Sequence, residues 1–328
     1  MITFQKPVLI TGINGFVGSH LAERLLAEGI AVRGVVRRPD AAASLAARGI
    51  EILAGDLLDT ASIVRATTGC QMVVHAAGWT GGDKAPHELR WSTNVEGTAN
   101  VLAAGKTCGI ERFVHISSIA VYGLNRAPLI DESMATPFVD ELYPDSKIAA
   151  ESLVLASGLP YVIVRPASTY GPRGEGWTVG VIDQILHGLC LQGRDNGLVT
   201  PGYIDNVVDG LWLALTHKSA PGSIFNICDG HAVTYREFYL AYARMLGLNS
   251  LPIRSAWRVW LARTKLASLG RHLLGRAPVG PWSFHFRFNP SQYSIEHARR
   301  LLGYEPKVDF LEGMCRTEAW LRTNGYLS

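Results

Sequence analysis

Short apolar runs alternate with longer helix-like stretches through the first half of the chain. The apolar runs have the length of buried strands, and they lie at Val8–Ile10, Ala31–Val36, Glu51–Leu53, Met72–His75, Phe113–Ile116 and Tyr161–Val164. Helical patterns occupy the intervals at Val17–Glu28, Ala41–Ala47, Asn94–Cys108 and Pro144–Ser157. Strands that alternate with helices predict parallel βαβ units and a doubly wound sheet.

The alternation loosens after Pro172. Residues Arg173–Thr200 are rich in glycine and have no strand rhythm, whereas Asp205–Leu215 predicts a helix and Ser223–Ile227 predicts a strand. We therefore expect an α/β fold, with a Rossmann doubly wound parallel sheet and a smaller C-terminal substrate domain. The expected dinucleotide-binding domain is 1–172 with 203–228 returning to it, and the expected substrate-binding domain is 173–202 with 229–328.

Composition narrows the class of protein. Of the 328 residues, 48% are hydrophobic and 18% are charged, which is typical of a packed globular enzyme. The net charge of +3 is spread along the chain, so no nucleic-acid partner is expected. The five cysteines have no metal-ligand spacing, so no metal site is expected. The sequence has neither a signal-peptide pattern nor an apolar stretch of membrane-span length, and we expect a cytoplasmic protein.

A glycine-rich turn, Thr11–Gly18, joins the first strand to the first helix. Gly12 allows a tight turn, Gly15 lets the backbone approach a pyrophosphate, and Gly18 allows close packing of helix on strand. The helix start at Phe16 and Val17 then presents free N–H groups to the phosphates. A turn that binds nothing is the alternative, and the strand before it and the helix after it disfavour that alternative. The turn therefore predicts a dinucleotide site.

The second strand ends in Arg37 and Arg38. An acidic residue at this place binds the ribose 2′-hydroxyl of NAD, whereas a guanidinium group pairs with the 2′-phosphate of NADP. We expect NADP(H) to be preferred, through Arg37 above all, with NAD(H) as the open alternative. Behind the fourth strand, the small residues Ala76, Ala77 and Gly78 would let the backbone pass close to the cofactor.

Tyr143 and Lys147 are one helical turn apart, which places them on one face of the helix if Pro144 is its first residue. A nearby ammonium group lowers the pKa of a phenol, so the pair predicts a general acid/base at a carbonyl or alcohol oxygen. Alone, the pair is common by chance, and a surface tyrosine with a solvated lysine is the favoured interpretation. Ser118 follows the strand Phe113–Ile116 and could hold the reacting oxygen near Tyr143.

Asn94 opens the helix between these strands and could hold a water or a backbone group behind Lys147. A plain helix cap is the alternative interpretation of Asn94. The order of the glycine turn, Asn94, Ser118, Tyr143 and Lys147 resembles that of the extended short-chain dehydrogenase/reductases, a group in the NAD(P)-dependent epimerase/dehydratase superfamily. The resemblance covers nearly the whole chain. It implies that Ser118, Tyr143, Lys147 and Asn94 are catalytic, and that the enzyme is a homodimer.

The same resemblance implies further cofactor contacts. Asp56 and Leu57 follow the third strand, where the family contacts the adenine. Pro166 and Ser168 lie where relatives pack on the nicotinamide. Tyr143 and Lys147 contact the cofactor as well as the reacting oxygen.

Departures from the family pattern favour one branch. Sugar dehydratases have an acidic pair after the active hydroxyl residue, whereas Ile119 and Ala120 follow Ser118 here. Pro201 and Gly202 precede Tyr203, where nucleotide-sugar enzymes often have Arg-Asp. The second strand, Val32–Arg37, resembles that of the dihydroflavonol reductase and 3β-hydroxysteroid dehydrogenase branch.

We therefore expect an NADPH-dependent oxidoreductase that interconverts a ketone and a secondary alcohol on a moderately large, apolar small molecule. An NAD(P)-dependent epimerase or isomerase of a sugar or nucleotide sugar stays open, as does a binding protein without catalysis. Substrate-wall candidates are Ser118, whose alternative interpretation is a polar strand end, and Trp79, Thr80, Trp177 and Tyr203, for which core packing is at least as good an interpretation. The basic, tryptophan-bearing segment 255–276 is either a lid or a weak membrane-surface contact, and we favour the lid.

Overall fold

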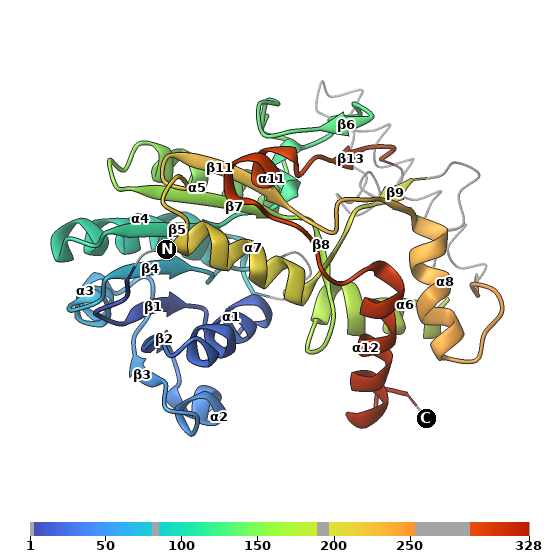
Figure 1. Ribbon diagram of the computed structural model, residues 1–328, viewed down its shortest axis with the longest axis horizontal. Coiled ribbons are helices and arrows are strands. Elements are labelled where there is room, and N and C mark those ends of the chain that lie inside the picture. The colour runs from blue at the N-terminus through green and yellow to red at the C-terminus, as the bar shows by residue number, and fades with distance from the viewer. Residues whose placement is uncertain (1–2, 81–84, 189–196, 253–288, 328) are drawn as a thin grey trace.

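The computed structural model describes residues 3–80, 85–188, 197–252 and 289–327. Its centre is a seven-stranded sheet in the order β11-β7-β5-β4-β1-β2-β3, in which all neighbours are parallel (Figure 1). The expected α/β doubly wound sheet is confirmed. The strands are β1 Val8–Thr11, β2 Val32–Val36, β3 Glu51–Ala54, β4 Met72–His75, β5 Arg112–Ile116, β7 Tyr161–Pro166 and β11 Ser223–Ile227.

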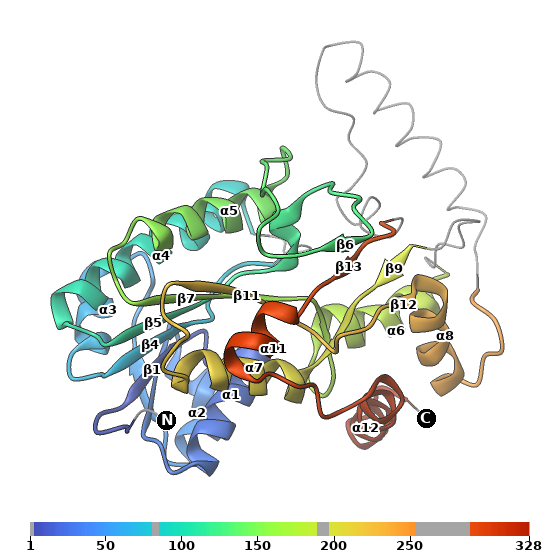
Figure 2. The same ribbon diagram turned by 45° about the horizontal axis from the view of Figure 1, so that its top comes forward.

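Helices cover both faces of this sheet (Figures 1 and 2). Leu9, Val73 and Phe113 point to one face, where they pack with the helices α3, α4 and α5. Val8, Val74 and their neighbours point to the other face, toward α1 and α7. The bounds are α1 Phe16–Ala27, α3 Thr60–Thr67, α4 His87–Cys108, α5 Leu142–Leu155 and α7 Ile204–Thr216.

Three helix predictions differ from the structure. The helix α4 begins at His87 rather than at Asn94, and α5 begins at Leu142, so Pro144 is its third residue. The sequence pattern missed α3, which begins after the cap Asp59, whose side chain accepts a hydrogen bond from Ala61 N at 3.1 Å. The predicted helix 41–47 is a short 3₁₀ turn, η1 Pro39–Ala42, followed by α2 Ala43–Ala46.

Apart from α11 Glu296–Leu302, which packs on β11 and α7, most of the rest of the described chain gathers beside the carboxyl ends of the sheet strands. In both views the helices α6, α8 and α12 lie together at this side (Figures 1 and 2). The division at 172 and 202 into two domains stays a prediction. The remaining elements are η2 Ile119–Tyr122, β6 Leu129–Ile130, β8 Ser168–Tyr170, η3 Glu175–Val179, α6 Gly180–Leu186, β9 Leu198–Val199, β10 Pro201–Tyr203, β12 Val233–Thr234, α8 Tyr235–Met245, β13 Gln292–Tyr293, α11 Glu296–Leu302 and α12 Phe310–Thr323.

Within the described ranges, no helix combines the length and the apolar character that crossing a membrane requires. The segment 255–276, for which we expect a lid or a membrane-surface contact, lies outside the described residues.

Candidate active site

The glycine turn between β1 and α1 packs against the loop that follows β4. Gly12 has φ +67°, and a Cβ atom there would lie 2.6 Å from the backbone of Ala77. A Cβ on Gly18 would lie 2.3 Å from the carbonyl oxygen of Gly12. Because each of these two glycines faces the backbone of another segment where a side chain would stand, only glycine fits at either position.

Gly15 is the N-cap residue of α1 in an extended conformation, so the helix starts directly at the turn. The first N–H groups of an α-helix have no partner inside the helix, and the N-terminal end of the helix dipole is positive. Phe16 and Val17 are the first two residues of α1 and carry such groups. This backbone fits an anionic group such as a pyrophosphate.

The carboxyl ends of β2 and β3 border the same side of the turn. Arg37 and Arg38 are both exposed directly after β2. Asp56 is exposed after β3, and its Oδ1 accepts a hydrogen bond from Leu58 N at 2.9 Å. Leu57 packs on α4, because a Cβ on Gly97 would lie 2.9 Å from its side chain.

Asn94 fixes the loop that follows β4, residues 76–80, which we call the cofactor loop. Its Oδ1 accepts from Trp79 N at 2.7 Å, and its Nδ2 donates to Trp79 O at 3.0 Å and to Ser146 Oγ at 2.9 Å. The alternative interpretation as a helix cap is wrong, because Asn94 lies in the second turn of α4 and not at its start. Asn94 therefore links the cofactor loop to the helix that carries Tyr143 and Lys147.

Lys147 is buried beside this loop. Its Nζ donates to Ile116 O at 2.9 Å, and a Cβ on Gly78 would lie 3.5 Å from the same Nζ. Burial lowers the pKa of Lys147 to about 8, although the Glu151 carboxylate opposes the shift. The side chains of Lys147 and Asn94 thus lie beside Gly78, close to the carboxyl ends of β4 and β5.

Tyr143 lies half-buried on the first turn of α5 and shares a hydrogen bond with Ser118. Ser118 also caps η2, where its Oγ accepts from Ala120 N at 3.1 Å. The expectation that Lys147 lowers the pKa of Tyr143 is wrong. Burial raises the pKa of Tyr143, and among the described residues the bond to Ser118 opposes this shift. Tyr143 is therefore a neutral phenol that holds its proton at neutral pH.

Buried hydroxyl groups stand at the ends of β5 and β7. The Oγ atoms of Ser117 and Ser168 have no hydrogen-bond partner in the part of the chain that the structure describes. Pro166 ends β7, and Ala167 N donates to Ile227 O at 3.0 Å. Buried polar groups are normally paired, so the two serine hydroxyls fit a ligand with polar groups of its own. A glycine cradle, the exposed Arg37 and these hydroxyls together fit a dinucleotide cofactor.

The residues expected at the substrate wall do not form one surface. Tyr203 is buried against Tyr170, at 5.5 Å between ring centroids, and Trp177 packs edge-on against Phe238 at 5.7 Å. Trp79 lies instead toward β2, and Thr80 is exposed. Contact of any of them with a substrate stays a prediction.

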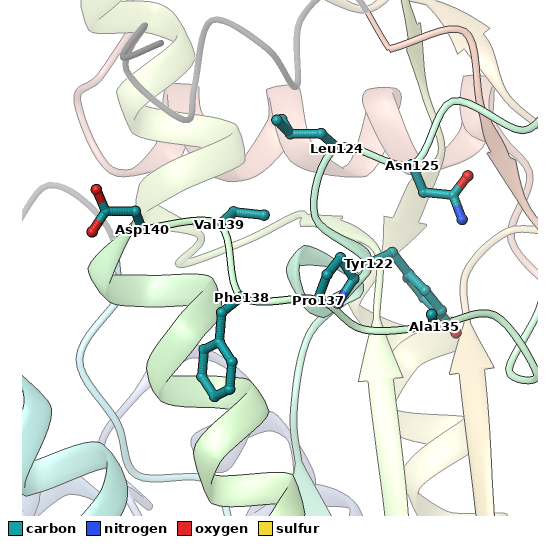
Figure 3. Close-up of a pocket in the computed structure, with 8 residues that line it drawn as sticks. All are labelled: Tyr122, Leu124, Asn125, Ala135, Pro137, Phe138, Val139 and Asp140. Carbon is teal, nitrogen blue, oxygen red and sulfur yellow. The ribbon is translucent and has the colours of Figure 1, made fainter. Parts of the chain in front are cut away.

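The structure adds a cavity of about 570 Å³ that no sequence motif indicates (Figure 3). It lies along the segment between Ser118 and Tyr143, and it is lined by Tyr122, Leu124, Asn125, Ala135, Pro137, Phe138, Val139 and Asp140. Exposed apolar side chains in a loop, such as Phe138 with 63% of its surface accessible, are the one signal that could have found it.

Comparisons with known proteins agree with this geometry. The family model described as the NAD dependent epimerase/dehydratase family matches residues 8–228. Over 93% of each chain, the protein is 30% identical to the 4-hydroxy-2-methyl-3-oxo-4-farnesyl-3,4-dihydroquinoline-1-oxide ketoreductase of Stigmatella aurantiaca. It is 31% identical to a 3 beta-hydroxysteroid dehydrogenase/Delta 5→4-isomerase of Mycobacterium tuberculosis, over 91% of this chain and 86% of the relative.

A solved structure, MoeE5 in complex with UDP-glucose and NAD, superposes with a TM-score of 0.74 at 25% identity, over 97% of this chain and 99% of that one. The family model spans more than half of the chain, and the two relatives match it almost end to end. The chain therefore belongs to the NAD dependent epimerase/dehydratase family, as an NAD(P)-dependent enzyme of the extended short-chain dehydrogenase/reductase type.

Proposed function

We propose that this protein is an NADP(H)-dependent oxidoreductase that interconverts a ketone and a secondary alcohol on a moderately large, apolar small molecule. The observation that carries the proposal is the pairing of Ser118 with a neutral Tyr143 one helical turn before the buried Lys147. A phenol that keeps its proton is suited to protonate a carbonyl oxygen.

The proposed reaction divides between cofactor and protein. When bound, the reduced nicotinamide would supply a hydride for the carbonyl carbon. Ser118 and Tyr143 donate hydrogen bonds to the carbonyl oxygen, and the Tyr143 hydroxyl proton passes to that oxygen as the C–O double bond becomes single. The phenolate left on Tyr143 regains a proton from water before the next turnover, because burial favours the neutral phenol. Lys147, which is largely protonated below pH 8, is proposed to hold the cofactor, as the family resemblance implies.

The preference for NADP(H) is supported by the residues at the end of β2. Arg37 and Arg38 are exposed there, and no carboxylate follows the strand before Asp40. A guanidinium group can bind the 2′-phosphate with two hydrogen bonds. The apolar substrate class is supported by the cavity beside the Ser118–Tyr143 segment and by the substrates in the names of the two relatives.

A purified-enzyme assay tests the proposal. The protein is mixed with a panel of steroid, alkyl and aryl ketones, and oxidation of NADPH and of NADH is followed in parallel. We expect turnover with NADPH and a lower kcat/KM with NADH. In Tyr143→Phe, kcat should fall about 10²- to 10⁴-fold, because a general acid of this kind contributes that factor.

Tyr161→Phe is the matched control, because it removes a phenol from the start of β7, at the opposite end of the sheet strands from Ser118. It should keep the wild-type rate. Full activity of Tyr143→Phe would contradict the mechanism. A dinucleotide that stays bound through purification, with epimerisation of a sugar nucleotide and no net consumption of NADPH, would replace the reductase by the epimerase.

A further inference from the structure

Trp79 occupies an unusual place in the cofactor loop. It follows Gly78 in the loop after β4, which ends at His75, and both of its backbone polar groups are bonded to the side chain of Asn94, at 2.7 Å and 3.0 Å. Asn94 is itself buried in α4. The backbone of Trp79 is therefore held against α4 and, through the bond from Asn94 to Ser146, near the helix α5 that carries Tyr143 and Lys147.

The indole ring is fixed as well. Trp79 Nε1 donates to Thr93 Oγ1 at 3.2 Å, and Thr93 Oγ1 donates to Leu89 O at 2.7 Å, within α4. A half-buried tryptophan whose ring nitrogen is bonded has little rotational freedom left. This fixed ring is directed toward the end of β2.

The guanidinium group of Arg37 lies over the Trp79 ring, with Cζ 5.7 Å from the ring centroid. Tryptophan is the aromatic side chain that attracts a cation most strongly, and the attraction orders a flexible side chain. An exposed arginine otherwise loses conformational freedom when it is fixed on a ligand. Stacking on a fixed ring removes part of that loss before the ligand arrives.

We infer that Trp79 is a positioning residue for recognition of the 2′-phosphate of NADP(H), which acts by holding Arg37 in place at the end of β2. The inference rests on the proposed preference for NADP(H). It assigns Trp79 to the adenosine end of the cofactor site, whereas the sequence led us to expect Trp79 at the substrate wall. Asn94 then supports two functions, because the side chain that lies beside Lys147 also fixes the loop that orders Arg37.

The test measures binding of two nucleotides that differ only in the 2′-phosphate, adenosine 2′,5′-bisphosphate and adenosine 5′-monophosphate, by titration calorimetry on the full-length protein. In Trp79→Leu we expect the dissociation constant of the bisphosphate to rise roughly two- to five-fold, the range of one cation–π contact, with the monophosphate unchanged. Trp79→Phe keeps an aromatic face and should recover most of the loss.

Two further variants isolate the cause. Trp212→Leu is the matched control, because Arg24 stacks on Trp212 at 5.5 Å in the contact between α1 and α7, and it should leave both dissociation constants unchanged. In an Arg37→Ala background, Trp79→Leu should have no further effect on the bisphosphate, because the residue through which it acts is gone.

The outcomes separate the inference from the proposed function. Equal binding of the two nucleotides by the wild-type protein would overturn the NADP(H) preference and the inference with it. Tighter wild-type binding of the bisphosphate that is unaffected by Trp79→Leu would overturn the inference alone. Equal weakening of both nucleotides, or an unchanged loss in the Arg37→Ala background, would assign Trp79 a general structural role and would likewise overturn it.

Discussion

At the scale of single residues, two buried histidines lie side by side behind the active site and differ in their partners. His75 Nδ1 is 2.7 Å from Thr11 Oγ1, and His75 Nε2 is 3.0 Å from Thr98 Oγ1. Thr98 donates its proton to Asn94 O, so it accepts from His75 Nε2, and this assigns the neutral tautomer. Neither ring nitrogen of His115 has a partner among the described residues. Burial lowers the pKa of His75 to about 3 and that of His115 well below its usual range.

We expect His115→Phe to stabilise the protein in acid. Below pH 6.5 the unfolded chain binds a proton at this histidine and the folded chain does not, so His115 lowers stability as the pH falls. Phenylalanine removes this loss, which amounts to about 2 kcal/mol between pH 8 and pH 5. Urea unfolding of both proteins at the two pH values measures the difference.

His75→Phe is the contrasting variant at the neighbouring strand. It leaves the hydroxyl groups of Thr11 and Thr98 without their partner, so it should lower the free energy of unfolding by about 1–3 kcal/mol even at pH 8. A gain for His115→Phe that is equal at both pH values would show that titration of His115 is not the cause.

Sequence spacing could predict which residues lie on one helix face, but not the pKa values that they have there. It predicted that Tyr143 and Lys147 share a helix face, and both lie on α5. It could not predict the pKa values, because these depend on burial by residues far along the chain. The pKa of Tyr143 is raised by burial against the opposing hydrogen bond from Ser118, and Lys147 turns toward the carbonyl of Ile116.

At the scale of elements, the turn between β1 and α1 depends on one contact between backbones. We expect Gly18→Ala to lower the free energy of unfolding by about 1–3 kcal/mol and to weaken NADPH binding at least about ten-fold. The added methyl would lie 2.3 Å from the Gly12 carbonyl oxygen, so α1 must shift away from the turn. Thermal unfolding and a fluorescence titration with NADPH measure the two effects.

Gly176→Ala is the control for this change. Gly176 lies in the helical turn η3 and has open space where a Cβ would stand, so alanine should be neutral there. Wild-type stability and wild-type NADPH affinity in Gly18→Ala would contradict the role assigned to the close approach of α1.

Elements with a strong apolar period were predictable, and those without it were not. The strands Met72–His75 and Ser223–Ile227 have the bounds that their apolar runs predict. The first two turns of α4 contain Glu88, Arg90 and Ser92, so they show no apolar period that would place the start at His87. The short helix α3 follows the cap Asp59, but its eight residues are too few for an apolar period to be recognised, and its packing on α4 is not visible in the local sequence.

At the scale of the whole molecule, Arg112 joins parts of the chain that are distant in sequence. It is buried at the start of β5 and donates to the carbonyl oxygens of Ala214, Leu215 and His217, at 2.6–3.1 Å. These carbonyls end α7, where a helix has no internal donors left. The contact therefore fixes α7 on the central sheet.

We expect Arg112→Met to lower the free energy of unfolding by about 2–4 kcal/mol, because it removes charge-assisted hydrogen bonds from buried carbonyl groups. Arg112→Lys keeps one charge and should recover part of the loss. Urea unfolding followed by circular dichroism measures both variants. Equal stability of the wild type and the methionine variant would mean that packing alone holds α7.

The position of β11 at the edge of the sheet has a consequence for how the protein is made. The strand β7 is almost wholly buried, and one of its hydrogen-bonding edges is covered by β11 alone. On the ribosome, the strands β1 to β7 emerge before Ser223–Ile227, so this apolar edge stays open for as long as the intervening residues are translated. An open edge can pair with other chains. Timely synthesis of the later residues therefore protects the nascent protein from aggregation.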